Sequence, residues 1–203
     1  MISIVNYGMG NIRYIQSAFI YLGVESDVIE SSSQIMSSAK LVLPGVGSFA
    51  KAMKNIEKMG ILDALNESVL VKKVPILGIC LGMQLLAESG DEDGPSRGLG
   101  WIPGRVRKID ARGDIKIPHI GFNSVHFSQT NHILFSGLGE IADFYFVHSY
   151  VLDCGNEQDI ASRTDYGERF VSGVSRDNIF GVQFHPEKSQ HNGLALLRNF
   201  AYL

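Results

Sequence analysis

The chain has 203 residues, 45% of them hydrophobic, and this allows one domain spanning residues 1–203 with a substantial buried core. The formal net charge of −3 gives no general attraction to nucleic acid or to anionic membrane surfaces. No apolar run reaches the ~18 residues that a membrane span needs, and the N-terminus lacks the basic start and apolar core of a secretory signal. We therefore expect a cytoplasmic protein that binds neither nucleic acid nor membranes.

The first half alternates short apolar runs with helix-like stretches, a pattern typical of a parallel sheet covered by helices. It predicts strands at residues 2–5, 24–29, 40–43 and 74–79, and helices at 11–22, 48–71 and 81–89. After a loop at 89–100, the pattern changes to short strands at 121–127, 144–151, 170–175 and 179–184, followed by a helix at 193–202. The expected fold class is α/β, with a central, mostly parallel sheet flanked by helices and added short strands in the second half.

A cysteine lies between the predicted strand 74–79 and the helix that follows it. Gly78 and Gly82 stand two residues before and two residues after Cys80, the spacing of a nucleophile elbow with cysteine in the serine position. The glycines relieve crowding at the strained turn, and a helix start favours the reactive thiolate. The N–H of Leu81 would then face a developing oxyanion. The alternative role, a small buried apolar side chain, is the usual fate of a free cysteine, and we assign a structural or incidental role to Cys154.

Cysteine chemistry needs a base, and the base needs a group that fixes its tautomer. His185 and Glu187 follow a predicted strand and are separated by one proline, so their side chains can lie on the same side of an extended segment. His185 is the candidate base and Glu187 the candidate orienter. His148, on an aromatic-rich strand, is a candidate pocket residue. The histidines show no close ligand pairing and the two cysteines are far apart, so we expect no metal site and no cofactor.

Two glycine-rich segments invite a ligand-binding interpretation. In Pro44-Gly45-Val46-Gly47-Ser48, after a predicted strand, Val46 or Gly47 could supply a second oxyanion donor, although an ordinary tight turn has the same composition. The segment Gly8-Met9-Gly10 is not a dinucleotide fingerprint, because the third glycine that such a motif requires is replaced by Arg13.

Six motifs together resemble class I glutamine amidotransferases, specifically the family of glutaminase subunits of imidazole glycerol phosphate synthase. In chain order the motifs are N-Y-G-M-G-N, P-G-V-G, G-I-C-L-G-M-Q, I-P-H-I-G-F-N, Y-F-V-H-S-Y and F-H-P-E-K-S. The resemblance covers the whole chain. It implies a single glutamine amidotransferase type 1 domain, which releases ammonia from L-glutamine and sends it to a barrel-fold cyclase partner in histidine biosynthesis.

The resemblance also assigns roles to residues, position by position. It makes Cys80 the nucleophile, His185 the general base and acid, and Glu187 the orienter, with Leu81, Val46 and Gly47 around the oxyanion. It implies substrate contacts from Gly45, Gln84 and the backbone of Ser149 and Tyr150. It places Asn11, Phe122, Tyr145 and Lys188 near the partner surface.

One position departs from the family. Phe122 replaces the tryptophan that the family typically has, which keeps an apolar ring but removes the indole N–H donor. One alternative is therefore a paralogous subunit that feeds another synthase, such as one modifying a surface-polysaccharide sugar. A cysteine peptidase or gamma-glutamyl hydrolase of the same fold is a more distant alternative. A catalytically silent module is disfavoured, because all three triad residues are present.

Overall fold

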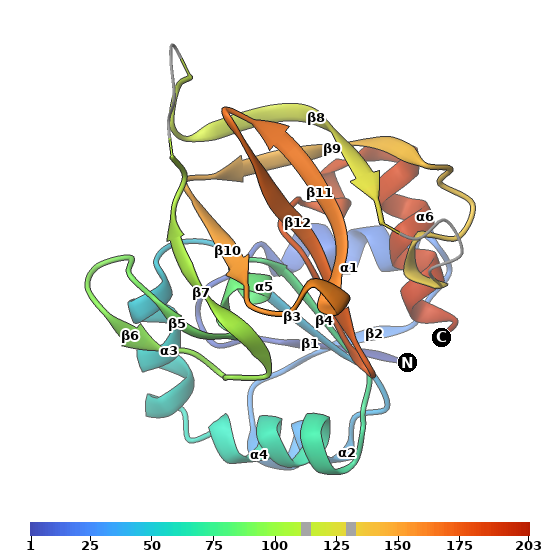
Figure 1. The fold of residues 1–203 in the computed structure, drawn as a ribbon. Helices are drawn as coiled ribbons and strands as arrows, with labels where there is room; N and C mark the ends of the chain where they lie inside the picture. The colour runs from blue at the N-terminus through green and yellow to red at the C-terminus, as the bar shows by residue number, and fades with distance from the viewer. Residues whose placement is uncertain (111–114, 129–132) are drawn as a thin grey trace.

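The computed structural model describes residues 1–110, 115–128 and 133–203, which form an α/β fold around one continuous sheet (Figure 1). Its main path runs β2-β1-β3-β4-β13-β12-β10-β7-β5-β6, and β11, β8 and β9 extend from β12 as a branch. Neighbours from β2 to β13 pair in parallel. The pairs around β12, β10 and β8 are antiparallel. The expected fold class is confirmed.

The first half supplies the parallel strands and the helices beside them. Its elements are β1 (Ile2–Val5), α1 (Ile12–Tyr21), β2 (Ser26–Ile29), α2 (Ser32–Ser37), β3 (Leu41–Gly45), α3 (Phe49–Lys58), α4 (Leu62–Asn66), a π-helical turn (Glu67–Val71), β4 (Ile76–Cys80), α5 (Leu81–Leu85), β5 (Ala87–Gly90) and β6 (Ser96–Arg97).

The second half supplies the antiparallel strands and returns to the centre of the sheet. Its elements are β7 (Ile102–Lys108), β8 (His119–Phe127), β9 (Ile141–His148), β10 (Tyr150–Cys154), β11 (Ile160–Tyr166), β12 (Glu168–Arg176), β13 (Ile179–Val182) and α6 (Gln190–Ala201), with 3-10 turns at Ile133–Phe135, Glu157–Asp159 and Pro186–Lys188. No helix of the described segments is long and apolar enough to cross a membrane.

Two apolar clusters lie on opposite faces of the parallel strands, as the alternation of side chains along a strand requires. Leu41 and Leu43 join the cluster that contains α2, α3 and α4, and Val42 joins the cluster that contains α1 and α6 (Figure 1). The carboxyl ends of β3, β4 and β13 therefore meet at one edge of a covered sheet. In open α/β sheets, ligands bind at that edge.

The predicted helix at 81–89 is wrong in its second half. Helix α5 ends at Leu85, and the chain continues as β5. The cause lies elsewhere in the sequence, because the N–H groups of Leu99 and Trp101 donate to the carbonyls of Leu85 and Leu86. The same contacts turn part of the predicted loop 89–100 into β5 and β6.

The predicted strand 144–151 is two strands. The chain bends at Ser149, where β9, paired with β8, gives way to β10, paired with β7 and β12. The predicted helix 48–71 is likewise interrupted at Gly60, whose φ of +66° lies in the left-handed region. Besides β5, β6 and the 3-10 turns, three elements of the described segments lie where no helix or strand was predicted: α2, β7 and β11.

Candidate active site

Cys80 lies on a strained turn where β4 passes directly into α5. Its φ is +54° and its ψ is −111°, a conformation that a non-glycine residue adopts only when its surroundings impose it. The surroundings here are two glycines. A Cβ on Gly82 would lie 1.8 Å from the Leu43 carbonyl oxygen, and a Cβ on Gly78 would lie 2.7 Å from the Gly82 oxygen. Helix α5 thus packs on β3 and β4 at a distance that only glycine permits.

His185 reaches the same edge because β13 pairs in parallel with β4, with Val182 opposite Ile79. Its backbone is fixed to β9, since its N–H donates to the Tyr145 carbonyl at 2.8 Å. The hydroxyl of Ser189 donates to the His185 carbonyl at 2.6 Å and accepts from the Tyr145 N–H at 2.9 Å. The segment after β13 is therefore held on both sides.

The imidazole of His185 is oriented by a buried carboxylate. Nδ1 of His185 lies 2.8 Å from Oε1 of Glu187, and both side chains are almost completely excluded from solvent. Burial lowers the pKa of His185, but the charge and hydrogen bonding of Cys80, together with Glu187, outweigh burial and raise this pKa to about 10. The pair therefore favours an imidazolium beside the Cys80 sulfur at neutral pH.

Nε2 of His185, on the far side of the ring from Glu187, is buried and has no hydrogen bond of good geometry within the described chain. Catalytic hydrogen bonds are commonly long or misaligned before substrate binds. This nitrogen is thus the one available for proton exchange beside Cys80.

Two glutamines connect the sulfur to the far wall of the site. The buried Gln183 donates from Nε2 to the Cys80 sulfur at 3.7 Å, and its Oε1 accepts from Nε2 of Gln84 at 3.0 Å. Gln84 also donates to the Tyr150 carbonyl at 2.9 Å. Gln183 was not singled out from the sequence, although a polar residue between the buried Val182 and Phe184 is the signal that could have found it.

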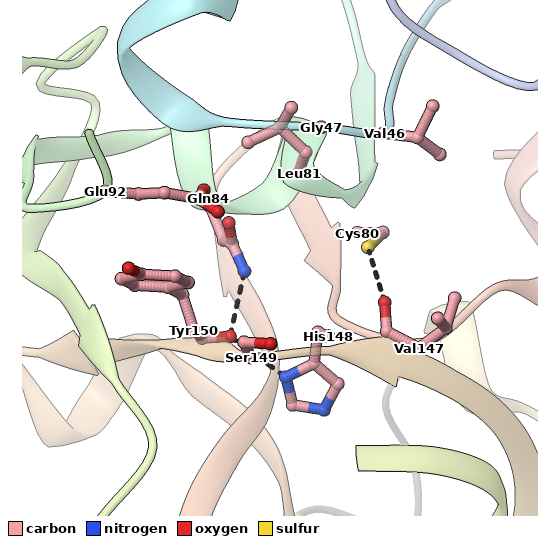
Figure 2. A pocket seen from close by; sticks show the side chains of 10 residues that line it. All are labelled: Val46, Gly47, Cys80, Leu81, Gln84, Glu92, Val147, His148, Ser149 and Tyr150. Atoms are coloured by element: carbon pink, nitrogen blue, oxygen red, sulfur yellow. Dashed lines mark hydrogen bonds between the residues drawn. The ribbon is translucent and has the colours of Figure 1, made fainter. Parts of the chain in front are cut away.

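A pocket of about 240 Å³ opens beside the sulfur (Figure 2). This volume lies just below the usual range of ligand pockets, about 300–1,000 Å³, and suits a single amino acid. The sulfur lies 3.9 Å from the Val147 carbonyl oxygen on the β9 wall. The pocket is lined by Val46, Gly47, Cys80, Leu81, Gln84, Glu92, Val147, His148, Ser149 and Tyr150. The structure thus brings the predicted oxyanion residues, three of the four predicted substrate contacts and the candidate pocket residue His148 to one site.

Gly45, the fourth predicted substrate contact, lies at the base of this site rather than in its lining. It pairs with Cys80 across β3 and β4. A Cβ at Gly45 would lie 2.6 Å from the Tyr7 hydroxyl, which donates to the Pro44 carbonyl. Gly47 has a φ of +106°, so glycine is required there for the loop conformation.

Glu92 is a pocket residue for which the sequence offered no motif. It lies beside Gln84 in Figure 2, in the acidic stretch after β5. Its Oε2 accepts from the Phe49 N–H at 3.1 Å, and burial raises the pKa of the carboxyl group above its usual value. The site therefore has an acidic group on the wall away from Cys80.

The residues predicted near a partner surface divide into a cluster and an outlier. Phe122, 51% exposed, meets the Tyr145 ring edge-on at 5.7 Å, and the Lys188 ammonium lies 5.6 Å from the centre of that ring. Asn11 lies directly before α1, where its carbonyl accepts from the N–H groups of Tyr14 and Ile15. We call Phe122, Tyr145 and Lys188 the β8–β9 cluster.

Cys154 lies apart from the site. Its thiol donates to the Asn156 carbonyl at 3.4 Å, and burial raises its pKa. Among the described residues, no group of three or more His, Cys, Asp or Glu side chains could hold a metal ion.

Comparison with known proteins identifies relatives over the full length of the chain. The family described as Glutamine amidotransferase class-I matches residues 3–203. A Leptospira interrogans protein named imidazole glycerol phosphate synthase subunit HisH is 43% identical and covers 100% of both chains. A Campylobacter jejuni protein named subunit HisH 1 is 45% identical over 100% of both chains. A Chlorobium luteolum subunit HisH is 46% identical over 99% of both chains.

Solved structures show the same fold at lower identity. A crystal structure described as glutamine amidotransferase superimposes with a TM-score of 0.77 at 20% identity, covering 99% of both chains. The structure of PurLQS from Thermotoga maritima gives a TM-score of 0.76 at 17% identity, covering 98% of this chain and 96% of that one.

Proposed function

The chain belongs to the class I glutamine amidotransferase family, and on that premise we propose that Cys80, His185 and Glu187 form its catalytic triad. The observation that carries this assignment is the strained Cys80 beside an imidazole oriented by the buried Glu187 carboxylate. We propose that residues 1–203 act as one amidotransferase domain in the cytoplasm.

The reaction begins with attack of the Cys80 thiolate on the side-chain amide carbon of L-glutamine, which forms a C–S bond and a tetrahedral oxyanion. The Leu81 N–H and the loop at Val46 and Gly47 stabilise the negative oxygen. The imidazolium of His185 protonates the amide nitrogen, the C–N bond breaks, and ammonia leaves a thioester on Cys80. His185 then takes a proton from water as the water attacks the thioester, and glutamate and the free thiol are released.

The remaining pocket groups suit the amino-acid end of glutamine. The Glu92 carboxylate offers a partner for the α-ammonium group on the wall away from the sulfur. The backbone of Ser149 and Tyr150 offers hydrogen bonds to the α-carboxylate. Gln84 holds this wall through the Tyr150 carbonyl, and Gly45 keeps the opposite loop close to Cys80.

The chain is a glutaminase subunit of the imidazole glycerol phosphate synthase type, acting in histidine biosynthesis, since its family is that of the class I glutamine amidotransferases and its full-length relatives are named imidazole glycerol phosphate synthase subunit HisH. We propose that a separate cyclase subunit of barrel fold receives the ammonia and docks on the β8–β9 cluster and on Asn11. This cluster combines an exposed aromatic ring with a cation over a second ring, a composition typical of interface anchors.

The test is Cys80→Ala in the complex with the cyclase subunit. Glutamine-dependent synthesis is abolished, whereas synthesis from free ammonia persists, because the partner's chemistry does not use the thiol. Cys154→Ala is the matched control and retains both activities. Glutamine turnover by Cys80→Ala would refute the assignment, and cleavage of a peptide panel without response to glutamine would favour a peptidase.

The identity of the ammonia acceptor is tested separately because of Phe122. The cyclase substrate should stimulate glutamine hydrolysis by the complex. If the cyclase neither binds the chain nor stimulates it, the ammonia goes to another synthase, such as one modifying a surface-polysaccharide sugar.

A further inference from the structure

Two buried histidines outside the triad lie at the pocket wall, where His148 is a lining residue and His119 contacts it. His119 on β8 and His148 at the end of β9 face each other across the antiparallel pair, with Nδ1 of His119 at 3.0 Å from Nε2 of His148. His119 is 2% exposed and His148 is 6% exposed. The mechanism above uses neither ring, so their mutual contact needs its own explanation.

The hydrogen bonds around the two rings fix every proton. Nδ1 of His148 lies 2.9 Å from the Tyr150 carbonyl, which can only accept, so this nitrogen carries the proton. Nε2 of a neutral His148 is then an acceptor, and it must receive the proton from Nδ1 of His119. Nε2 of His119 accepts in turn from Nδ2 of Asn123 at 3.3 Å.

The orientation of the Asn123 amide is set independently. Its Oδ1 accepts from the Ser124 N–H at 2.8 Å, and its Nδ2 also donates to the Asp165 carbonyl at 3.0 Å. The four groups therefore form one directional hydrogen-bond chain, in which each group donates to the next, from Asn123 through His119 and His148 to the Tyr150 carbonyl. Burial lowers the pKa of His119 to about 4 and that of His148 to about 3, so both rings are neutral near pH 7, as this hydrogen-bond chain requires.

The hydrogen-bond chain ends at the Tyr150 carbonyl, which lies outside the hydrogen bonds between β10 and β7. The chain bends at Ser149, whose carbonyl accepts from the Ile109 N–H of the segment after β7. Tyr150 is opposite Lys108 in that pairing, so its own N–H and C=O both point away from β7. Within the described segments, the Gln84 side chain and Nδ1 of His148 each lie 2.9 Å from the Tyr150 carbonyl oxygen and hold it (Figure 2).

We propose that His119 and His148 are positioning residues for glutamine binding, which fix the Tyr150 peptide through a single tautomer of each ring. This inference rests on the proposed function, because it assumes that the backbone of Ser149 and Tyr150 contacts the substrate. If His119 loses its donor, Nε2 of His148 becomes a buried acceptor without a donor, and the ring is no longer held in place beside the Tyr150 carbonyl.

Two substitutions at His119 separate positioning from packing. The ring stacks on Tyr166 at 3.9 Å and on Phe146 at 4.7 Å. His119→Phe keeps the stacked ring but removes the donor, so we expect KM for glutamine to rise about tenfold, the size of one lost buried hydrogen bond, with kcat within about twofold. His119→Asn loses the stack but keeps an N–H near the position of Nδ1, so KM should stay near the wild-type value although the melting temperature falls. If KM instead follows the melting temperature across the two variants, the histidines are structural and the proposal is wrong.

Labelling of Cys80 distinguishes this failure from failure of the proposed function. A glutamine-shaped diazo ketone needs the pocket, whereas iodoacetamide needs only the thiolate. His119→Phe should slow the first reagent about tenfold relative to wild type and leave the second unchanged, since one pocket hydrogen bond is lost. If each reagent labels His119→Phe at the same rate as wild type, the positioning role is wrong. A wild type that the diazo ketone does not label overturns the proposed function itself.

Nuclear magnetic resonance of the histidine nitrogens tests the hydrogen-bond chain without reference to activity. In the whole protein at pH 7, the rings of His119 and His148 should both be neutral with the proton on Nδ1. A proton on Nε2 of either ring would contradict the chain whatever the enzyme does.

Discussion

Replacing Glu187 by glutamine should weaken catalysis without removing the triad geometry. The Glu187 side chain is fully buried and lies 2.8 Å from Nδ1 of His185. Glutamine keeps an oxygen at that position but loses the charge. A hydrogen bond with a charged partner contributes about 1 to 2 kcal/mol more than a neutral one. We therefore expect kcat/KM for glutamine to fall about 5- to 30-fold, since ~1.4 kcal/mol corresponds to tenfold.

The same substitution should change the pH dependence with a defined sign. Glu187 is one of the groups that raise the pKa of His185 to about 10. The imidazolium that protonates the leaving ammonia is present below that pKa and is lost as pH rises through it. In Glu187→Gln, the alkaline decline of glutaminase activity should therefore begin at lower pH. Ammonia release measured from pH 6 to pH 10 gives the pH–activity profile. The carbon chemical shifts of the His185 ring, followed by nuclear magnetic resonance over the same range, give the apparent pKa of His185.

Glu168→Gln is the matched control for this variant. Glu168 also receives short hydrogen bonds from a cation, at 2.8 and 2.7 Å from Arg107, but it lies between β12 and β7, away from the pocket. It should lower stability and leave the glutaminase pH profile unchanged. A Glu187→Gln enzyme with wild-type kcat/KM and an unshifted alkaline limb would refute the orienting role.

Two further substitutions test the elbow. Gln183→Leu removes the amide donor that lies 3.7 Å from the Cys80 sulfur, so iodoacetamide should alkylate Cys80 about fivefold more slowly at pH 7. An unchanged alkylation rate would contradict a role of Gln183 in holding the thiolate. Gly82→Ala would put a Cβ 1.8 Å from the Leu43 carbonyl oxygen and should lower the free energy of unfolding in urea by about 3 kcal/mol or more. The control Gly139→Ala has open space around the added Cβ and should cost only about 1 kcal/mol, because its φ is left-handed. Equal losses in the two variants would show that close packing at Gly82 is not the cause.

The sequence predicted the parts of the site that depend on local pattern. Glycine spacing around Cys80, the strand before it, and the alternation that puts His185 and Glu187 on one side are all properties of a few neighbouring residues. The parallel order of β1, β3 and β4 follows from apolar runs separated by helices. These predictions needed no knowledge of distant contacts.

The sequence could not predict features that depend on distant contacts. Helix α5 ends at Leu85 because N–H groups fourteen or fifteen residues further along take its last carbonyls, and the apolar spacing of Leu85 and Leu86 fits a buried strand as well as a helix. Glu92 belongs to the site only because α3 begins beside it and donates the Phe49 N–H. The break at Ser149 is visible as a change in the alternation of buried side chains. Buried side chains alternate regularly up to His148 and resume out of phase at Val151, as expected where a strand changes its pairing partner.

The elbow and the histidine chain position the site by different physical means. At Gly82, the close approach of the helix backbone to the Leu43 carbonyl also aims Cys80 at the pocket, so any added atom disturbs stability and chemistry together. At His119, the stacked ring and the donated proton are separate properties of one side chain, because Tyr166 and Phe146 contact the ring faces and His148 contacts one nitrogen. A substitution can therefore remove one property and keep the other. Hence the nucleophile tolerates little variation in its setting, whereas the affinity for glutamine can be altered while the fold is retained.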